Sequence, residues 1–203
     1  MSDPIELEVL VTELVGYHAA ERRTAARQWL QAALAARLGA DAADLSFHDG
    51  LHGKPALVGV ADLAFNLSHS GATAMLAIAR GAHLEVGVDV ERLDRRVPID
   101  RAGRRAFDDR ERALVANDQP GLLRLWVAKE ALLKATGDGV SAGLDAVRLE
   151  RDEAGALQGR WRDEGAVAPV TIGATGDAVW ALTAYRVGPA GVREWLRPQV
   201  TVR

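Results

Sequence analysis

The sequence predicts an α+β protein, a pseudo-dimer of two similar halves that each pack a long helix on a small, mainly antiparallel sheet. Apolar residues recur with helical spacing over residues 19–38 and 121–136, and a glycine follows each segment. Alternating apolar and polar residues at 5–12 and 84–90 are typical of strands. The order of strand, helix, loop and further strands therefore occurs twice, although identity between the two copies is negligible.

Further strands are expected between and after these segments. The patterns at 64–70 and 73–79 indicate strands, and the second of these is expected to form a hairpin with 84–90. The C-terminal part, with its Gly and Pro turns, is typical of an antiparallel meander. The predicted domains are residues 1–84 and 85–203, and a cleft between them would be a natural place for a ligand.

Composition excludes several classes of protein. The chain has 203 residues, 48% of them hydrophobic, which is enough for a sizeable core. The net charge of −3 argues against a partner such as nucleic acid bound by bulk electrostatics. Because there is no cysteine, disulfides, thiolate metal sites and cysteine nucleophiles are excluded. No signal peptide or membrane-spanning run is visible, so a cytoplasmic protein without a membrane partner is expected.

Acidic side chains occupy one face of a predicted strand and one face of a predicted helix. Asp89 and Glu91 project from the same side of the strand, with Cβ atoms roughly 6.5–7 Å apart. On the helix, Trp126, Glu130 and Lys134 follow one another at intervals of four residues and form one stripe. Taken singly, these are the solvent face of an edge strand and an amphipathic helix. Together, the three carboxylates form a candidate Mg²⁺ site that leaves room for water and a substrate phosphate.

Three blocks carry a family resemblance: Asn66-Leu67-Ser68-His69-Ser70, Gly87-Val88-Asp89-Val90-Glu91, and the segment from Trp126 to Lys134. They resemble the N-[IL]-S-H-S, G-[IV]-D-x-E and W-x-x-K-E-[AS]-x-x-K elements of the 4′-phosphopantetheinyl transferases of the surfactin-synthetase-activating, Sfp-like type. Gly53-Lys54-Pro55 is similar to that family's additional G-[RK]-P element. The motifs cover roughly residues 50–143.

This resemblance implies a reaction, a fold and partners. The family transfers the phosphopantetheine arm of coenzyme A to a serine hydroxyl of an acyl or peptidyl carrier protein and releases adenosine 3′,5′-bisphosphate. Such carriers serve fatty-acid, polyketide or nonribosomal-peptide synthesis. The implied fold is the pseudo-dimer with coenzyme A in the cleft, working as a monomer. The implied cofactor is Mg²⁺, with Mn²⁺ also possible, and its ligands would be Asp89, Glu91 and Glu130.

On the helix, the resemblance assigns Glu130 and Lys134 to catalysis. Either the Glu130 carboxylate or a metal-bound water would take the proton from the serine hydroxyl. Lys134 and Lys129 are expected to contact the pyrophosphate of coenzyme A, since lysine presents a compact positive charge. A solvated helix surface is the alternative for both lysines. Trp126 is expected to anchor the helix by packing.

The resemblance also assigns residues of the first half to coenzyme A. Ser68 and His69 correspond to contacts with the 3′-phosphate and its surroundings. Lys54 is expected to reach the nucleotide end, and Pro55 to shape the loop. Arg23, in the first long helix, corresponds more loosely to a basic contact with the 3′-phosphate.

Two other readings of the chain stay open. The arginines between residues 92 and 112 are expected to dock an acidic carrier, or else to form a salt-bridged helical face. As to function, the rivals are a metal-dependent phosphodiesterase or nuclease and a non-catalytic module that binds coenzyme A or a carrier. The strand lacks the (D/E)-x-K pattern of many nucleases after Asp89, and neither an acidic ligand nor Lys134 is missing, so both rivals rank below transfer.

Overall fold

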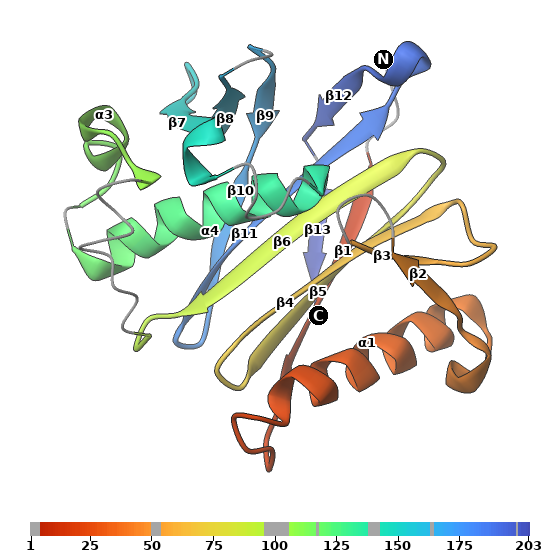
Figure 1. The fold of residues 1–203 in the computed structure, drawn as a ribbon. Coiled ribbons are helices and arrows are strands. Elements are labelled where there is room, and N and C mark those ends of the chain that lie inside the picture. The colour runs from red at the N-terminus through yellow and green to blue at the C-terminus, as the bar shows by residue number, and fades with distance from the viewer. Residues whose placement is uncertain are drawn as a thin grey trace.

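The computed structural model describes residues 5–49, 54–95, 106–116, 118–137, 143–162, 165–197 and 199–203. Two sheets face each other, and each is covered on its outer side by one long helix (Figure 1). Helix α1 (Arg22–Leu38) covers the first sheet, and helix α4 (Gln119–Thr136) covers the second. The α+β class predicted from the sequence is therefore confirmed.

The first sheet has four strands and is antiparallel except at one edge. In order across the sheet they are β13 (Gln199–Val202), β1 (Glu6–Glu13), β5 (Thr73–Arg80) and β4 (Leu63–Ser70). Strand β13 runs parallel to β1, whereas β4 and β5 form a hairpin closed by Gly71 and Ala72. Gly71 has φ 59°, a conformation that glycine adopts readily.

The second sheet is built on the long strand β11 (Ala178–Val187). One edge of β11 pairs with β6 (Leu84–Arg92), and the other pairs with β10 (Thr171–Thr175) and β12 (Arg193–Leu196), always antiparallel. Smaller sheets complete the strands: β2 (Phe47–Asp49) with β3 (Pro55–Leu57), and β7 (Val147–Arg151) with β8 (Leu157–Trp161) and β9 (Val167–Pro169). The predicted antiparallel pairing after residue 146 is confirmed among these strands.

The predicted long helices are also confirmed, and both end at a glycine in the left-handed conformation. These are Gly39 with φ 65° and Gly137 with φ 76°. Helix α4 begins where the Asp118 side chain accepts a hydrogen bond from the backbone N–H of Gly121. The shorter helical pieces are α3 (Asp109–Arg112) and the 3₁₀ turns η1 (Ala42–Asp44), η4 (Leu144–Ala146) and η5 (Pro189–Gly191).

The predicted hairpin between β5 and β6 is wrong. Strand β5 pairs with β1 along one edge and with β4 along the other, so no edge is left for β6. Strand β6 instead pairs with β11 in the second sheet. An alternating pattern reports which side chains share a face, but it does not report which strand lies alongside.

Strand β6 lies between helix α4 and the core that fills the space between the two sheets. Leu84, Val86, Val88 and Val90 pack between the two sheets. Gly87 faces α4, where a Cβ atom would lie 2.0 Å from the carbonyl oxygen of Ala131. The absent side chain therefore lets the helix backbone rest directly on the strand.

The predicted boundary at residue 84 and the internal duplication remain predictions. Strand β13 places C-terminal residues in the first sheet, beside β1. Within the described segments, no helix is long and apolar enough to cross a membrane.

Candidate active site

Side chains join the two sheets where β4 and β6 lie next to each other. Three alternate β4 residues accept hydrogen bonds from three alternate backbone N–H groups of β6: Val88 to Asn66 Oδ1 (2.9 Å), Val90 to Ser68 Oγ (3.4 Å) and Arg92 to Ser70 Oγ (3.2 Å). All three β4 side chains are buried. The Asn-x-Ser-His-Ser block thus connects the sheets. The side chain of His69 lies on the opposite face of β4 and is exposed.

Asp89 lies at this junction with only 4% of its surface exposed. Its Oδ1 accepts hydrogen bonds from Lys134 Nζ at 2.5 Å and from Ser68 Oγ at 2.8 Å. Its Oδ2 is buried and has no hydrogen-bond partner within the part of the chain that the structure describes. Strand β6, helix α4 and Ser68 of strand β4 therefore meet at one carboxylate.

Glu91 occupies the next position on the same face of β6 and is 5% exposed. Its Oε2 accepts a hydrogen bond from Ser70 Oγ at 2.6 Å, and its Oε1 forms an ion pair with Arg95. The predicted common face of Asp89 and Glu91 is confirmed. It is buried against β4 and α4, however, and is not the solvent face of an edge strand.

Glu130 shares the electrostatic environment of these two acids. Burial raises the pKa of its carboxyl group above 4.5, the negative charge of Asp89 raises it further, the positive charge of Lys134 opposes the rise, and Glu91 adds to it. A carboxylate responds to neighbouring charges in this way only over short distances. Helix α4 thus turns the predicted stripe of Glu130 and Lys134 toward β6.

Asp89 and Glu91 form ion pairs with basic side chains of the protein itself. Among the described residues, no group of three His, Cys, Asp or Glu side chains is placed to hold a metal ion. Instead Lys134 balances Asp89, and Arg95 balances Glu91. The donor set still suits Mg²⁺ or Mn²⁺, because the ligands would all be carboxylate oxygens and Asp89 Oδ2 lacks a partner. The metal ligands remain a prediction.

A cavity of about 580 Å³ opens beside Asp89 and collects most of the residues expected to bind coenzyme A. Those present on its wall are Arg23, Pro55, Ser68, His69 and Lys134. Sequence reasoning missed Arg27 and Phe47, which line the same cavity. Arg27 follows Arg23 by one helical turn, so their i, i+4 spacing on α1 was an available signal.

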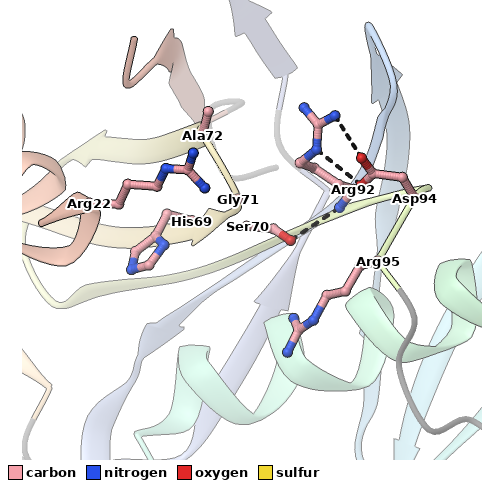
Figure 2. A pocket seen from close by; sticks show the side chains of 8 residues that line it. All are labelled: Arg22, His69, Ser70, Gly71, Ala72, Arg92, Asp94 and Arg95. Atoms are coloured by element: carbon pink, nitrogen blue, oxygen red, sulfur yellow. Dashed lines mark hydrogen bonds and ion pairs between the residues drawn. The ribbon is translucent and has the colours of Figure 1, made fainter. Parts of the chain in front are cut away.

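A second cavity, of about 650 Å³, also has His69 on its wall (Figure 2). Arg22 and His69 approach it from one side, and Arg92 and Arg95 from the other. Burial lowers the pKa of His69, and the positive charges of Lys134 and Arg23 lower it further. The imidazole therefore favours its neutral form in the free protein, and an anion in either cavity would raise its pKa.

Comparison with known proteins agrees with this geometry. Residues 85–185, which hold the β6 acids and helix α4, match the 4′-phosphopantetheinyl transferase superfamily. The chain belongs to this superfamily. It is 34% identical over 128 residues to the 4′-phosphopantetheinyl transferase HetI of Nostoc sp. (strain PCC 7120), covering 59% of this chain and 53% of HetI.

Two Bacillus subtilis relatives are similar to the same degree. A 4′-phosphopantetheinyl transferase is 32% identical over 130 residues, covering 61% of this chain and 56% of that protein. The 4′-phosphopantetheinyl transferase Sfp of strain 168 is 32% identical over 120 residues, covering 55% of this chain and 51% of Sfp. The chain thus spans about half the length of the curated relatives that it matches.

One residue of the superfamily's helix motif does not reach the cavity. Lys129 is fully buried on the opposite side of α4, where its Nζ lies 2.7 Å from Glu111 Oε1 and donates to the carbonyl of Ala106 at 2.5 Å. Its ammonium also lies 5.2 Å from the centre of the Phe107 ring. Lys129 has no exposed surface in this structure, so the geometry gives no support to its expected contact with a pyrophosphate, which remains an untested prediction.

The Lys54 ammonium also forms its hydrogen bonds within the protein. Its ammonium donates to Glu85 Oε2 at 2.6 Å, to the carbonyl of Val86 at 2.8 Å and to that of Ala135 at 3.3 Å. Burial lowers its pKa, and Glu85 only partly opposes this. Since an ammonium has three donors, all are used in tying the loop before β3 to β6 and to the end of α4. Lys54 therefore ties the chain beside Pro55 to β6 and α4, and its expected contact with the nucleotide remains a prediction.

The remaining predictions concern packing and docking. Trp126 is half-buried and packs against the core under α4, as expected of an anchor. Arg104 and Arg105, the centre of the predicted docking surface, lie outside the described residues, as does Gly53. Of the described arginines in that segment, Arg92 pairs with Asp94 and Asp177.

Proposed function

We propose that this chain transfers the 4′-phosphopantetheine arm of coenzyme A to a serine hydroxyl of an acyl or peptidyl carrier protein, with Mg²⁺ as the cofactor. The observation that carries the proposal is the meeting of Asp89 and Lys134, from segments far apart in the sequence, at the wall of a cavity lined with arginines. Phosphoryl transfer requires this combination of acids and cations beside a pocket for a polyanion.

In this reaction the serine oxygen attacks the β-phosphorus of the coenzyme A pyrophosphate. The bond from that phosphorus to the bridging oxygen breaks, and adenosine 3′,5′-bisphosphate leaves with the oxygen. Lys134 would neutralise charge on the pyrophosphate, and its position on the cavity wall, where it bonds the Asp89 carboxylate, supports this role. When bound, a divalent cation would supply further positive charge, and Asp89, Glu91 and Glu130 would hold it.

Glu130 is our candidate for the group that receives the serine proton. Burial and the charge of Asp89 raise its pKa in the metal-free protein, which favours acceptance of a proton, and a metal-bound water is the alternative acceptor. Arg23 and Arg27 on α1, with His69 on β4, would bind the 3′-phosphate at the other end of the cavity. The nucleotide would then lie between the two predicted halves, residues 1–84 and 85–203, within one monomer.

The direct test is intact-mass analysis of an apo carrier protein after incubation with this protein, coenzyme A and Mg²⁺. Gain of one phosphopantetheine group is expected, and Glu130→Gln and Lys134→Met should abolish it. Arg124→Gln removes an exposed charge from the same helix and should leave transfer unchanged. The proposal fails if a set of apo acyl and peptidyl carrier proteins remains unmodified by this protein. Nicking of supercoiled plasmid would favour a phosphodiesterase instead.

A further inference from the structure

The two serines of the β4 motif have hydroxyl groups whose directions follow from their partners. A hydroxyl carries one proton to donate and two lone pairs to accept with. Ser68 Oγ accepts from the Lys134 ammonium at 3.0 Å and from the Val90 N–H at 3.4 Å. Both neighbours are donors only, so the proton of Ser68 must point to Asp89 Oδ1, 2.8 Å away.

The same logic applies one step along the strand. Ser70 Oγ accepts from the backbone N–H of Arg92 at 3.2 Å and lies 2.6 Å from Glu91 Oε2. Its proton is therefore donated to Glu91. Hydrogen bonds from a hydroxyl to a carboxylate are among the stronger ones, and both serines are buried, which keeps water from competing.

The serines bond one oxygen of each acid, Asp89 Oδ1 and Glu91 Oε2, and the second oxygen of each acid has no bond to a serine. Asp89 Oδ2 is buried without a hydrogen-bond partner in the described part of the chain, and Glu91 Oε1 forms an ion pair with the half-exposed side chain of Arg95. A short strand spacing brings the two acids to one face, but rotation about their side-chain bonds would otherwise leave the oxygens undirected.

We propose that Ser70, together with Ser68, is a positioning residue that orients the β6 carboxylates so that one oxygen of each is presented to a divalent cation. This inference rests on the metal requirement in the proposed function. It gives the serines of the motif a role through Glu91 and Asp89, distinct from contact with the 3′-phosphate. Groups that orient metal ligands from behind typically contribute strongly to metal affinity.

The neighbouring Asn66 provides a matched control. It makes the same kind of bridge between the sheets, accepting from the Val88 N–H at 2.9 Å, and it is buried to a similar degree. Among the described contacts, this bridge involves neither β6 acid. Asn66→Ala therefore removes a bond that joins the sheets but leaves both carboxylates held by their serines.

The test is direct titration of the coenzyme A-free protein with Mn²⁺, followed by electron paramagnetic resonance of the free ion. Ser70→Ala is expected to weaken Mn²⁺ binding roughly 10- to 100-fold, as the loss of such supporting groups typically does. Ser70→Thr keeps the hydroxyl and should restore binding. Asn66→Ala should lower the melting temperature about as much as Ser70→Ala but leave the Mn²⁺ affinity unchanged. If Ser70→Ala does not fold, Ser70→Cys keeps the size with a poor donor and is expected to weaken binding in its place.

The outcomes separate this inference from the proposed function. Equal Mn²⁺ affinity of wild type and Ser70→Ala, in a wild type that modifies carriers, would overturn the role of Ser70 alone. Mn²⁺ binding that depends on Ser70, in a wild type that modifies no carrier, would overturn transfer and support the positioning role. Absence of any Mn²⁺ binding to wild type would overturn this inference together with the metal requirement.

Discussion

The ammonium of Lys129 lies 2.7 Å from Glu111 Oε1, and neither side chain exposes more than 1% of its surface. The next residue, Glu130, lies about 100° further round α4, within the electrostatic influence of Asp89. Adjacent charges of one motif therefore have separate functions. Lys129 ties α4 to the segment around α3, and the Glu111 carboxylate also accepts from the backbone N–H groups of Asp108 and Leu149.

Replacing Lys129 should destabilise the fold. Lys129→Met leaves the Glu111 carboxylate buried without its cation, and breaking such a pair costs about 3–5 kcal/mol. Urea unfolding followed by circular dichroism measures this loss, with Arg124→Gln as the control on the exposed face of the same helix. A loss below about 1 kcal/mol would show that the pair contributes only as much as an exposed ion pair.

Gly87 should tolerate no side chain. In Gly87→Ala the new Cβ would lie 2.0 Å from the Ala131 carbonyl oxygen, so α4 must move away from β6 and carry Glu130 and Lys134 with it. We expect a loss of about 3 kcal/mol, at the upper end for overpacking, together with loss of transfer. Gly188→Ala is the control, since its Cβ would meet only the Val192 carbonyl at 3.4 Å. Similar melting temperatures for both variants would contradict the close packing of α4 on β6.

The ion pair between Glu8 and Arg37 should make stability depend on pH. The hydrogen bonds from Arg37 lower the pKa of Glu8 below 4.5, so the folded state holds the Glu8 proton less tightly than the unfolded chain does. The stabilisation is therefore complete above pH 4.5 and is lost as the pH falls through the lowered folded pKa. Glu8→Gln should cost about 1 kcal/mol at neutral pH and almost nothing in strong acid. A difference between wild type and variant that is constant with pH would be inconsistent with this pair.

His69 should report nucleotide binding. Its pKa is lowered by burial and then by Lys134 and Arg23, so in the free protein it titrates below 6.5. Adenosine 3′,5′-bisphosphate adds negative charge beside the ring and should raise the pKa of His69, which nuclear magnetic resonance of the imidazole protons can follow. The exposed His18 outside the cavity serves as an internal control for its chemical shifts. No change at His69 with saturating nucleotide would remove it from the binding site.

Replacing Lys54 should mainly lower stability, whereas replacing Arg23 should mainly weaken nucleotide binding. Lys54→Met removes three hydrogen bonds from an ammonium and should cost about 2 kcal/mol of stability. Arg23→Ala removes an exposed cation from the cavity wall and should weaken binding of adenosine 3′,5′-bisphosphate with little change in stability. Calorimetric binding and urea unfolding of both variants make the comparison. The assignment is reversed if Lys54→Met weakens nucleotide binding more than Arg23→Ala does.

The local pattern of the sequence was sufficient for the helices, most strands and the shared face of Asp89 and Glu91. This is so because backbone geometry alone sets the direction of successive side chains, every second residue in a strand and every fourth in a helix. For the same reason the stripe of Glu130 and Lys134 was visible before the fold was known.

Tertiary structure decided what each of those faces meets. Only the fold shows that β6 pairs with β11 and not with β5, and that the serines of β4 donate hydrogen bonds to the β6 acids. It also shows that Lys129 is buried in the core and that the Lys54 ammonium donates to groups of the protein. These outcomes depend on which strand edges remain free and which acceptors lie within reach after packing. Such contacts join residues far apart along the chain, and no local periodicity encodes them.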